Sequence, residues 1–523
     1  MISNTIIPLV EPYLQSSTLL RPLLLKLGLS GTALWIITKY FIYRLYLHPV
    51  NSIPGPSVDW IPLLGNMREI VKDDPGAPHR RWTKRYGSVV GYKGPWNNPR
   101  ILVTDPNLLK EILTLNQYDY IKPAETKQFL GPVVGEGVLL VEGDIHKYQR
   151  KMLNPAFSVQ ALRGLVPAIA VPAIHLRDKW LKMLSAGKPT EIKISSDLNL
   201  ATLDVIGVAG FGANFGTVQG ADPDTSGGRL SQAYMDLFTG EASLQRILAL
   251  FIPLFRQVPT QRNKALRRDI ETLHKEAMAI VERGKSEFGS QHEKGKKSRN
   301  LLDLMIGEVD EETGQGMSSE DLQAQCLTFL AAGHETTAVS LSWGLWLLAQ
   351  NPEVQEELRE EVNTIFSNNV DELPSYDAIN NLTVLNNVCK ETMRLYPPVP
   401  MTNRVSVKDG VLGGQYFVPK GTRIFISPMV THTNPEYWGD DADKFRPSRW
   451  NESPANQVNP YVYMPFLEGG RKCIGYRFAL IEFKIIMALL VMRLKFSEKP
   501  GFSPRMKQQV TLRPAPNMTL MVE

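Results

Sequence analysis

The decapeptide FLEGGRKCIG, residues 466–475, contains one of only three cysteines in the chain and lies about fifty residues before the C-terminus. Two cations, Arg471 and Lys472, precede Cys473, and glycines flank the group, so its surroundings differ from those of a thiol in an apolar core. The apolar sequence that follows, residues 475–494, predicts a helix. The sulfur would therefore lie at a helix N-terminus, where backbone N–H groups and the helix dipole favour a thiolate.

Three chemical roles compete for this thiol. A zinc ligand normally has a second Cys or His within a few residues, but the nearest histidine is His432. A nucleophilic cysteine requires a histidine base close in space, which the sequence alone leaves open. Axial ligation of haem fits best, because glycines such as Gly469 and Gly475 let a flat ligand approach the backbone. A thiolate in that position pushes electron density toward cleavage of an O–O bond.

Composition excludes several classes of protein. The chain has 523 residues and 43% hydrophobic content, which suffices for a large buried core. Its net charge of +5 is spread over 58 basic and 53 acidic residues, too dilute for a nucleic-acid groove, so we expect no nucleic-acid partner. The three cysteines, Cys326, Cys389 and Cys473, are far apart, which argues against a disulfide framework and favours a reducing compartment.

The N-terminal segment, residues 1–50, contains the run LGLSGTALWIITKYFIYRLYL at 27–47. This run is about long enough to cross a hydrocarbon core, and its two cations lie toward its C-terminal end. It predicts a retained single-span anchor that leaves the rest of the chain in the cytosol; an interfacial helix or hydrophobic arm is the alternative. Residues 51–66 are rich in proline and predict a stiff hinge before a domain spanning 60–523.

The rest of the chain reads as one large catalytic domain, mainly α with small β-sheets, because most of its apolar patterns have helical periodicity. Strand signals are confined to short runs such as 88–94, 99–105 and 415–428. Polar stretches at 220–228 and 289–300 predict surface loops.

The longest predicted helix, residues 318–350, is apolar almost all round and must be buried, yet Gly333, Glu335, Thr336 and Thr337 lie at its centre. In one interpretation the hydroxyls bond to carbonyls four residues earlier. In the other, the helix opens locally at Gly333, and Thr336 and Glu335 relay protons to a bound group. The sequence leaves both interpretations open.

Glu391 and Arg394 lie one helical turn apart on a helix that is apolar on one side. Glu356 and Arg359 have the same spacing on a charged helix, where a solvated pair is expected. A buried Glu391–Arg394 pair would need further hydrogen bonds to be tolerated.

Several motifs together resemble the cytochrome P450 family. The decapeptide matches the family's haem-binding signature Phe-x-x-Gly-x-Arg-x-Cys-x-Gly at Phe466, Gly469, Arg471, Cys473 and Gly475. AGHETT from 332 resembles the oxygen-activation motif of the family's central helix, and FRPSRW from 445 resembles its Phe-x-Pro-x-Arg segment. The resemblance covers essentially the whole chain and implies a membrane-anchored haem-thiolate monooxygenase.

By this resemblance Cys473 is the axial ligand of haem b, Thr336 and Glu335 form the proton relay, and Arg449 completes a buried triad with Glu391 and Arg394. The remaining positions that the resemblance assigns to cofactor binding are His146, which stands where a Trp is usual, Arg150, Arg404 and Gly333. Those that it assigns to the substrate pocket are Phe329, Ala332, Val399 and the stretch 118–140.

The implied reaction is hydroxylation or epoxidation of a hydrophobic small molecule with O2, at the endoplasmic reticulum membrane. A terpenoid, polyketide or other secondary metabolite is the expected substrate, with a fatty acid or sterol as the alternative. An O2-independent isomerase or dehydratase of the same fold, or a non-catalytic haem-binding protein, also remains open. Because no flavin or nicotinamide motif is present, electrons must come from a separate NADPH-dependent flavoprotein reductase, docked near Lys147, Lys151, Arg471 and Lys472.

Overall fold

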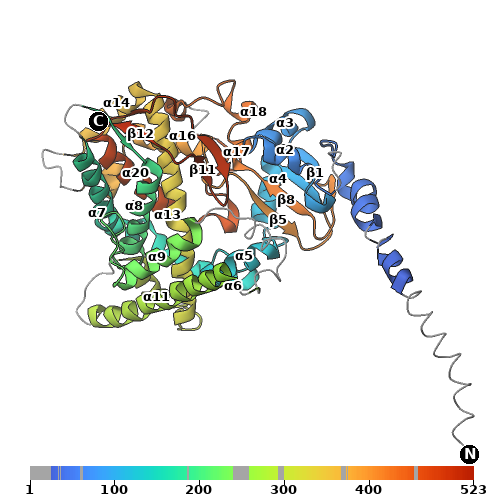
Figure 1. Cartoon of the computed structure of the whole chain (residues 1–523), viewed down its shortest axis with the longest axis horizontal. Coiled ribbons are helices and arrows are strands. Elements are labelled where there is room, and N and C mark those ends of the chain that lie inside the picture. The colour runs from blue at the N-terminus through green and yellow to red at the C-terminus, as the bar shows by residue number, and fades with distance from the viewer. Residues whose placement is uncertain are drawn as a thin grey trace, which may run out of the picture.

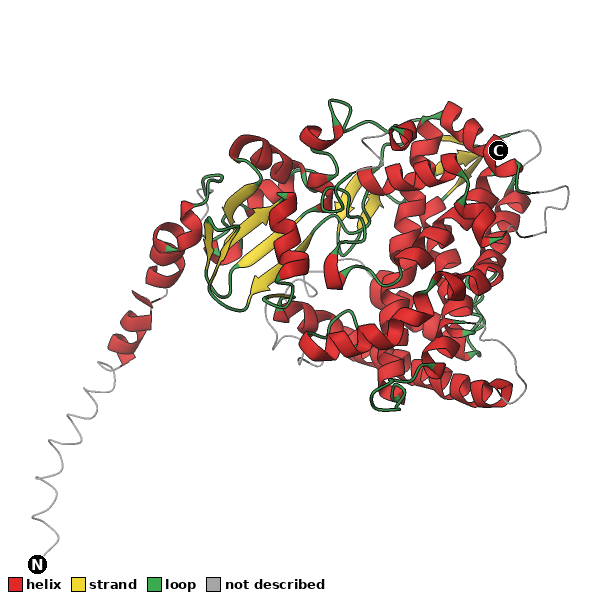
Figure 2. Ribbon diagram, turned by 180° about the vertical axis from the view of Figure 1, so that it is seen from behind, coloured by secondary structure: helices red, strands yellow, loops and turns green. Residues whose placement is uncertain are grey.

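The computed structural model describes residues 25–523 except 33, 36, 59–62, 185–187, 240–257, 259, 293–299, 367–372, 374 and 453–457. Helices make up most of the body, and the largest sheet lies at the end nearest the N-terminal helix (Figure 1, Figure 2). The predicted class, mainly α with small β-sheets, is confirmed. The start of the domain near Trp60, the segment Met1–Arg21 and most of the predicted loop at 289–300 lie outside the described residues.

The helices of the body are arranged around one long central helix (Figure 1). The α-helices are α2 Met67–Lys72, α3 Ala77–Tyr86, α4 Pro106–Lys110, α5 Ala124–Val134, α6 Gly143–Leu153, α7 Val159–Met183, α8 Ile194–Val205, α9 Ser226–Thr239, α11 Gln261–His292, α12 Leu301–Gly307, α13 Ser319–Gln350, α14 Pro352–Asn363, α15 Tyr376–Asn380, α16 Thr383–Leu395, α17 Pro428–Thr431, α18 Pro435–Trp438 and α20 Tyr476–Val491. Short 3-10 or π-helical segments are η1 Thr38–Leu47, η2 Pro49–Ser52, η3 Pro95–Asn97, η4 Glu111–Leu115, η5 Asn154–Phe157, η6 Ile206–Gly210, η8 Pro447–Asn451 and η9 Gly469–Arg471.

The largest sheet has five strands in the order β1-β2-β8-β5-β3. Its strands are β1 Val89–Lys93, β2 Pro99–Val103, β3 Tyr120–Ile121, β5 Thr402–Ser406 and β8 Arg423–Ile426. The first two form an antiparallel hairpin, and β2 pairs in parallel with β8, more than 300 residues later, in the register Arg100↔Arg423. The smaller sheets are formed by β4 Thr190–Ile192, β12 Leu520–Val522 and β9 Phe496–Glu498, by β10 Arg505–Gln508 with β11 Leu512–Ala515, and by β6 Gly410–Leu412 with β7 Tyr416–Val418.

The N-terminal helical segment projects away from the body, and its described part is mostly exposed (Figure 1). At its base, the Arg44 guanidinium donates to the Trp96 carbonyl at 2.8 Å, and the Asn97 amide donates to the Tyr40 carbonyl at 3.0 Å. Among the described residues, one helix is long and apolar enough to cross a membrane, α7. Because α7 packs against α8 and α20, it is a core helix, and the span at 27–47 stays a prediction.

The proline-rich segment before the body is not a free hinge. Val50 and Ile53 are buried, and the Pro54 carbonyl accepts a hydrogen bond from the Gly91 backbone N–H of β1 at 3.0 Å. A Cβ atom on Gly55 would lie 1.7 Å from the Gly91 carbonyl oxygen, so glycine permits this close approach. Residues 50–55 therefore dock on the sheet and fix where the N-terminal helix leaves the body.

The predicted long helix is confirmed as α13, which spans 32 residues. The Ser318 hydroxyl accepts the Asp321 backbone N–H at 3.0 Å and caps the helix, and Asn351 with Pro352 ends it. Its middle and C-terminal half are almost entirely buried against α8, α16 and α20. This burial follows from apolar residues on every face of the helix.

Candidate active site

A cavity of about 350 Å³ lies between α13 and the segment that carries Cys473. Apolar side chains from several elements line much of it. Among them are Val138, Leu139, Phe157, Ile206, Phe329, Ala332, Val399 and Phe483, so the three residues predicted for the substrate pocket share this cavity. Of the predicted stretch 118–140, residues 122, 138 and 139 reach it.

Cys473 is exposed toward this cavity from the turn between η9 and α20. Its backbone N–H donates to the Phe466 carbonyl at 2.9 Å, which closes the loop that presents the thiol. Gly469 adopts a positive φ of 76°, and a Cβ there would lie 1.9 Å from the Leu113 carbonyl oxygen, so this glycine serves packing against η4. Gly475 faces the cavity. A Cβ atom added to Gly475 would have a Phe157 ring carbon as its nearest neighbour, at 3.7 Å. Only one of the two predicted glycines therefore leaves space for a flat ligand.

The environment of the Cys473 thiol differs from the sequence prediction. Burial raises its pKa above the usual value, and the Gly475 backbone N–H, Arg150 and Lys472 offset that effect only in part. The helix N-terminus is present, since α20 begins three residues later, but desolvation outweighs it. The protein alone therefore favours the neutral thiol, and a bound metal must supply the charge that stabilises a thiolate.

On the other wall of the cavity, α13 presents Ala332, Gly333, Thr336, Thr337 and Ser340. The predicted opening of the helix at Gly333 is absent: α13 is α-helical throughout. The Thr336 hydroxyl donates to the Ala332 carbonyl at 2.8 Å, as in the other interpretation of the sequence. Thr336 therefore lines the cavity on an intact helix.

Glu335 does not line the cavity. Its carboxylate accepts hydrogen bonds from the Arg513 guanidinium, at 2.7 Å, and from the Thr511 hydroxyl, both at the hairpin of β10 and β11. Burial acts to raise the pKa of Glu335, but the contacts with Arg513 and Thr511 outweigh it and lower that pKa. Glu335 is therefore an ionised group that links α13 to the C-terminal hairpin, and its side chain is separated from the wall that carries Thr336.

Four buried or half-buried cations, Lys122, Arg150, Arg404 and Arg471, line the cavity together with His146. Arg404 donates only to the Thr402 hydroxyl and to the Asn403 carbonyl, at 3.1 and 2.8 Å, and burial lowers its pKa to about 10. Within the described part of the chain, Lys122, Arg150 and Arg404 have no carboxylate partner. Burial, followed by Arg471 and Arg404, holds the pKa of Lys122 well below its usual value. Apart from Arg471, which pairs with Glu142, these cations lack a counter-ion within the described chain, and a ligand with carboxylates, such as haem with its two propionates, would supply it.

His146 stands in this cluster, and its Nδ1 lies 3.2 Å from the Tyr118 hydroxyl. Burial, then Lys122 and Arg150, lowers the pKa of His146 to about 4, so the ring is neutral at pH 7 and retains one N–H donor. Sequence reasoning did not single out Lys122. Lys122 lies in the polar, charged stretch DYIKPAETK at 119–127, so nothing in the local sequence marks it.

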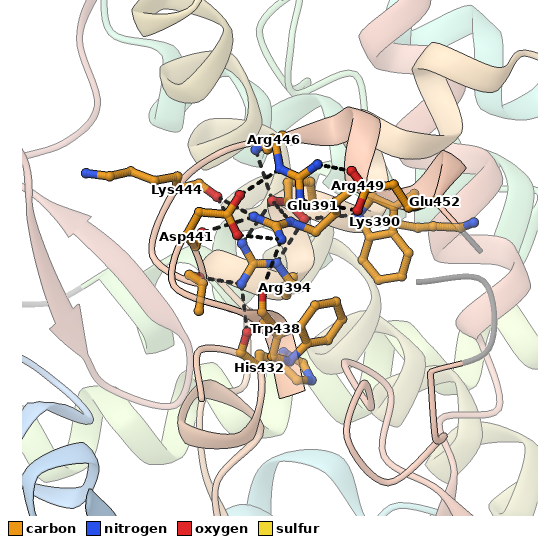
Figure 3. Close-up of polar contacts among 12 residues, drawn as sticks. Lys390, Glu391, Arg394, His432, Trp438, Asp441, Lys444, Arg446, Arg449 and Glu452 are labelled. Atoms are coloured by element: carbon orange, nitrogen blue, oxygen red, sulfur yellow. Dashed lines mark hydrogen bonds and ion pairs between the residues drawn. The ribbon is translucent and has the colours of Figure 1, made fainter. Parts of the chain in front are cut away.

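The predicted triad is a fully bonded buried cluster (Figure 3). Both oxygens of Glu391 accept from Arg394, at 2.9 Å each, and Oε1 also accepts from Arg449 Nε at 2.8 Å. Neither sequence motif pointed to the Trp450 indole N–H, which donates to Oε2 at 3.0 Å. Arg394 and Arg449 turn their remaining donors to backbone carbonyls, including those of His432 and Asp441. These bonds satisfy the condition under which a buried ion pair is tolerated.

Comparison with known proteins agrees with this geometry. The family model for cytochrome P450 matches residues 54–521. Cytochrome P450 monooxygenase 205 of Postia placenta is 35% identical over 504 residues, covering 90% of this chain and 91% of the relative. Cytochrome P450 monooxygenase sphH of Aspergillus fumigatus is 31% identical over 507 residues, covering 93% and 90%.

The chain belongs to the cytochrome P450 family. It is accordingly an oxidoreductase of the monooxygenase class, and the family implies a haem-thiolate cofactor. A third relative, cytochrome P450 monooxygenase ALT8 of Alternaria alternata, is 30% identical over 95% of this chain and 93% of its own. None of these three names states a substrate.

The cations predicted to dock a reductase on this P450 are each paired with a carboxylate. Lys147 bonds to Asp144 at 2.8 Å, Lys151 to Asp310 at 3.0 Å and Lys472 to Glu468 at 2.7 Å. The side chain of Arg471 is 5% exposed and pairs with Glu142, so it faces the interior rather than a partner. The predicted basic face is therefore largely neutralised, and Arg471 does not belong to it.

Proposed function

We propose that this P450 binds haem b in the cavity, with Cys473 as axial ligand, and hydroxylates or epoxidises a hydrophobic small molecule. The observation that carries the proposal is that one cavity joins the Cys473 thiol, the Thr336 hydroxyl and a set of buried cations without carboxylate partners. When bound, haem activates O2 reductively and supplies the oxygen atom that is inserted.

The residues of the chain would divide the work of binding. Arg150, Arg404, Lys122 and neutral His146 would hold the two propionates, since they are cavity groups that can donate to anions and, among the described residues, are not paired with a carboxylate as Arg471 and Lys472 are. Gly475 leaves the space for a flat ring beside Cys473. Phe329, Ala332 and Val399 would contact the substrate, and their apolar character favours an apolar one.

Thr336 is the hydroxyl that we propose as the proton donor at the reacting oxygen. In the structure its one hydrogen is donated to the Ala332 carbonyl, so the hydroxyl would have to turn away from that carbonyl to donate at the reacting oxygen. Glu335 would act only from a distance, because its ionised carboxylate is held by Arg513 and Thr511; any proton that it passed to Thr336 would have to cross ordered water. Replacing Thr336 with Ala should uncouple the reaction, so that NADPH is consumed and hydrogen peroxide is released with little product.

The substrate class that we propose is a terpenoid, polyketide or other secondary metabolite, and electrons would come from an NADPH-dependent flavoprotein reductase at the endoplasmic reticulum membrane. The apolar segment at 27–47 supports the membrane location, because a span there would keep the P450 beside a membrane-bound reductase and lipophilic substrates.

The carbon monoxide difference spectrum of the reduced protein tests the haem proposal. The wild type should give the thiolate-type band, and Cys473→Ala should lose it. A Cys473→Ala protein that kept this band would contradict the assignment. Binding spectra against a panel of lipophiles would then narrow the substrate class.

A further inference from the structure

A carboxyl group lies in the apolar core of α20, outside the machinery proposed so far. Glu482 is flanked by Ile481 and Phe483, and the residue is 1% exposed. Its one hydrogen-bond partner within the described chain is the Thr337 hydroxyl of α13, at 3.0 Å from Oε2. A buried carboxylate with a single neutral partner is costly, so a specific reason for its position is needed.

Hydrogen-bond geometry indicates that Glu482 carries a proton. The Thr337 hydroxyl lies within bonding distance of two oxygens, the Gly333 carbonyl at 3.2 Å and Glu482 Oε2 at 3.0 Å. A hydroxyl has one hydrogen and cannot donate to both. If the carboxyl is neutral, it donates to Thr337, which then donates to Gly333, and both bonds are made. Burial acts in the same direction, because it raises the pKa of Glu482 well above its usual value.

The two helices that this bond connects also touch closely at a second point. A Cβ atom on Gly344, seven residues after Thr337, would lie 3.0 Å from the Met487 methyl carbon and 3.2 Å from the Phe483 ring. Glycine therefore allows α13 and α20 to approach, and the bond between Thr337 and Glu482 fixes their register. Apolar contacts alone would leave that register less specified, since they have no directional requirement.

Both helices border the cavity at this crossing. Gly333 and Thr337 line it from α13, and Ala479 and Phe483 line it from α20, whose N-terminus follows Cys473 directly. The spacing of the helices thus sets the gap between the wall that carries Thr336 and the thiol.

We propose that Glu482 is a positioning residue: its bond to Thr337 clamps α13 to α20 and fixes the width of the haem site between Thr336 and Cys473. The inference rests on the proposed haem site and adds a device that holds it. The clamp has the order Glu482 carboxyl, Thr337 hydroxyl, Gly333 carbonyl, with each group donating to the next.

Matched variants of the haem-loaded protein test the clamp by the carbon monoxide difference spectrum. Thr337→Val and Glu482→Leu should raise the fraction of protein without the thiolate-type band several-fold. Glu482→Gln should retain the wild-type fraction, because its amide N–H can donate to Thr337. Thr202→Val is the control, since the buried Thr202 hydroxyl on α8 likewise bonds to carbonyls three and four residues earlier but holds no second helix.

Unfolding of the haem-loaded protein against pH tests the proton on Glu482 independently. Burial raises the pKa of Glu482, and the Thr337 hydrogen bond acts against that rise. Two other titratable groups lie nearby, on α20 and α16. Lys484 of α20 bonds to Asn380 at 2.6 Å, and burial raises the pKa of Cys389 of α16 to about 12. Above the usual carboxyl pKa, unfolding releases this proton, so the folded-to-unfolded ratio should fall about tenfold per pH unit relative to Glu482→Gln.

Either of two results would overturn the proposal. Thr337→Val could match Thr202→Val in its spectrum, or wild type and Glu482→Gln could show parallel pH profiles of unfolding. Failure of the haem site itself would look different, because the wild type would then lack the thiolate-type band.

Discussion

Two groups of buried arginines in this P450 differ in what surrounds them. Arg394 and Arg449 contact Glu391, and backbone carbonyls and the Asp441 carboxylate accept their other donors. Arg404, at the cavity, is 3% exposed and has no carboxylate partner among the residues described. The donors of Arg394 and Arg449 are satisfied within the protein, whereas Arg404 would need an anion from a bound ligand. We infer that pairing distinguishes a structural cation from one that would bind a ligand, although both are buried arginines.

The largest expected effect comes from breaking the complete cluster. Glu391→Gln would leave the buried Arg394 without its counter-ion and Arg449 with Asp441 alone, 3.2 Å away, which should cost about 3–5 kcal/mol of folding free energy. Since whole domains are stable by roughly 5–15 kcal/mol, little haem-loaded protein should be recovered. Thermal unfolding and the yield of haem-loaded protein measure this loss.

Glu356→Gln is the matched control, because Glu356 and Arg359 share the same Glu-x-x-Arg spacing at 2.6 Å. The Glu356 side chain is 56% exposed, so water screens the pair and the change should cost at most about 0.5 kcal/mol. Equal losses in the two variants would show that burial does not set the strength of the motif.

For a substitution of Arg404, the expected change in stability has opposite signs in the haem-free and the haem-bound protein. Arg404→Met removes a buried charge without a counter-ion, so the haem-free protein should become more stable by about 1 kcal/mol. Haem affinity should fall by about ten- to a hundredfold, the value of a charge-assisted hydrogen bond of roughly 1.5–3 kcal/mol. Unfolding of the haem-free protein and the rate of haem transfer to a competing apoprotein measure the two effects. A loss of stability in both forms would mean that Arg404 is structural, like Arg394.

The stability of the haem-free protein should also depend on pH, because His146 lies among the cations that have no carboxylate partner in the described chain. Because burial and neighbouring cations lower the pKa of His146 to about 4, its unfolded form binds a proton between about pH 6.5 and 4 that the folded form does not. The haem-free protein should therefore lose stability as the pH falls through this window, by on the order of 1 kcal/mol per pH unit. His146→Phe should remove this loss. Haem should weaken it in the wild type, because propionates would favour the charged ring; an unchanged profile would place the propionates elsewhere.

Local sequence signals were sufficient for features that depend on neighbouring residues. The cap of α13 at Ser318, the strands β1 and β2, and the Glu391–Arg394 spacing are all readable within a few residues, because helix caps, alternation and helical faces are local. The mainly helical class followed from the same periodicities. These features make up most of the fold.

Features that depend on distant partners were not readable. Glu335 and Arg513 are 178 residues apart, so no pattern indicated that the carboxylate faces the C-terminal hairpin instead of the cavity. The predicted stabilisation of the Cys473 thiolate considered its helix and adjacent cations but not the desolvation that raises its pKa. Lys151 and Arg471 read as free cations because their partners Asp310 and Glu142 become neighbours only through the fold. The pair of Lys147 and Asp144 is different, since the two lie three residues apart on α6 and could have been read from the sequence.

The smallest expected effect concerns pairs on the surface, where water weakens the distinction between paired and unpaired charge. Lys147 and Asp144 are both exposed and lie 2.8 Å apart. Lys147→Ala should lower the rate of electron transfer from an acidic reductase surface by no more than about threefold, and Asp144→Asn should raise it, because steering depends on net charge near the dock. Both changes should fade as salt is raised toward about 0.5 M, where screening acts within a few ångströms. Stopped-flow reduction at two ionic strengths measures them. If Asp144→Asn instead slowed reduction, the pair itself, not its net charge, would be what the reductase recognises, and pairing would matter at the surface as it does around Glu391.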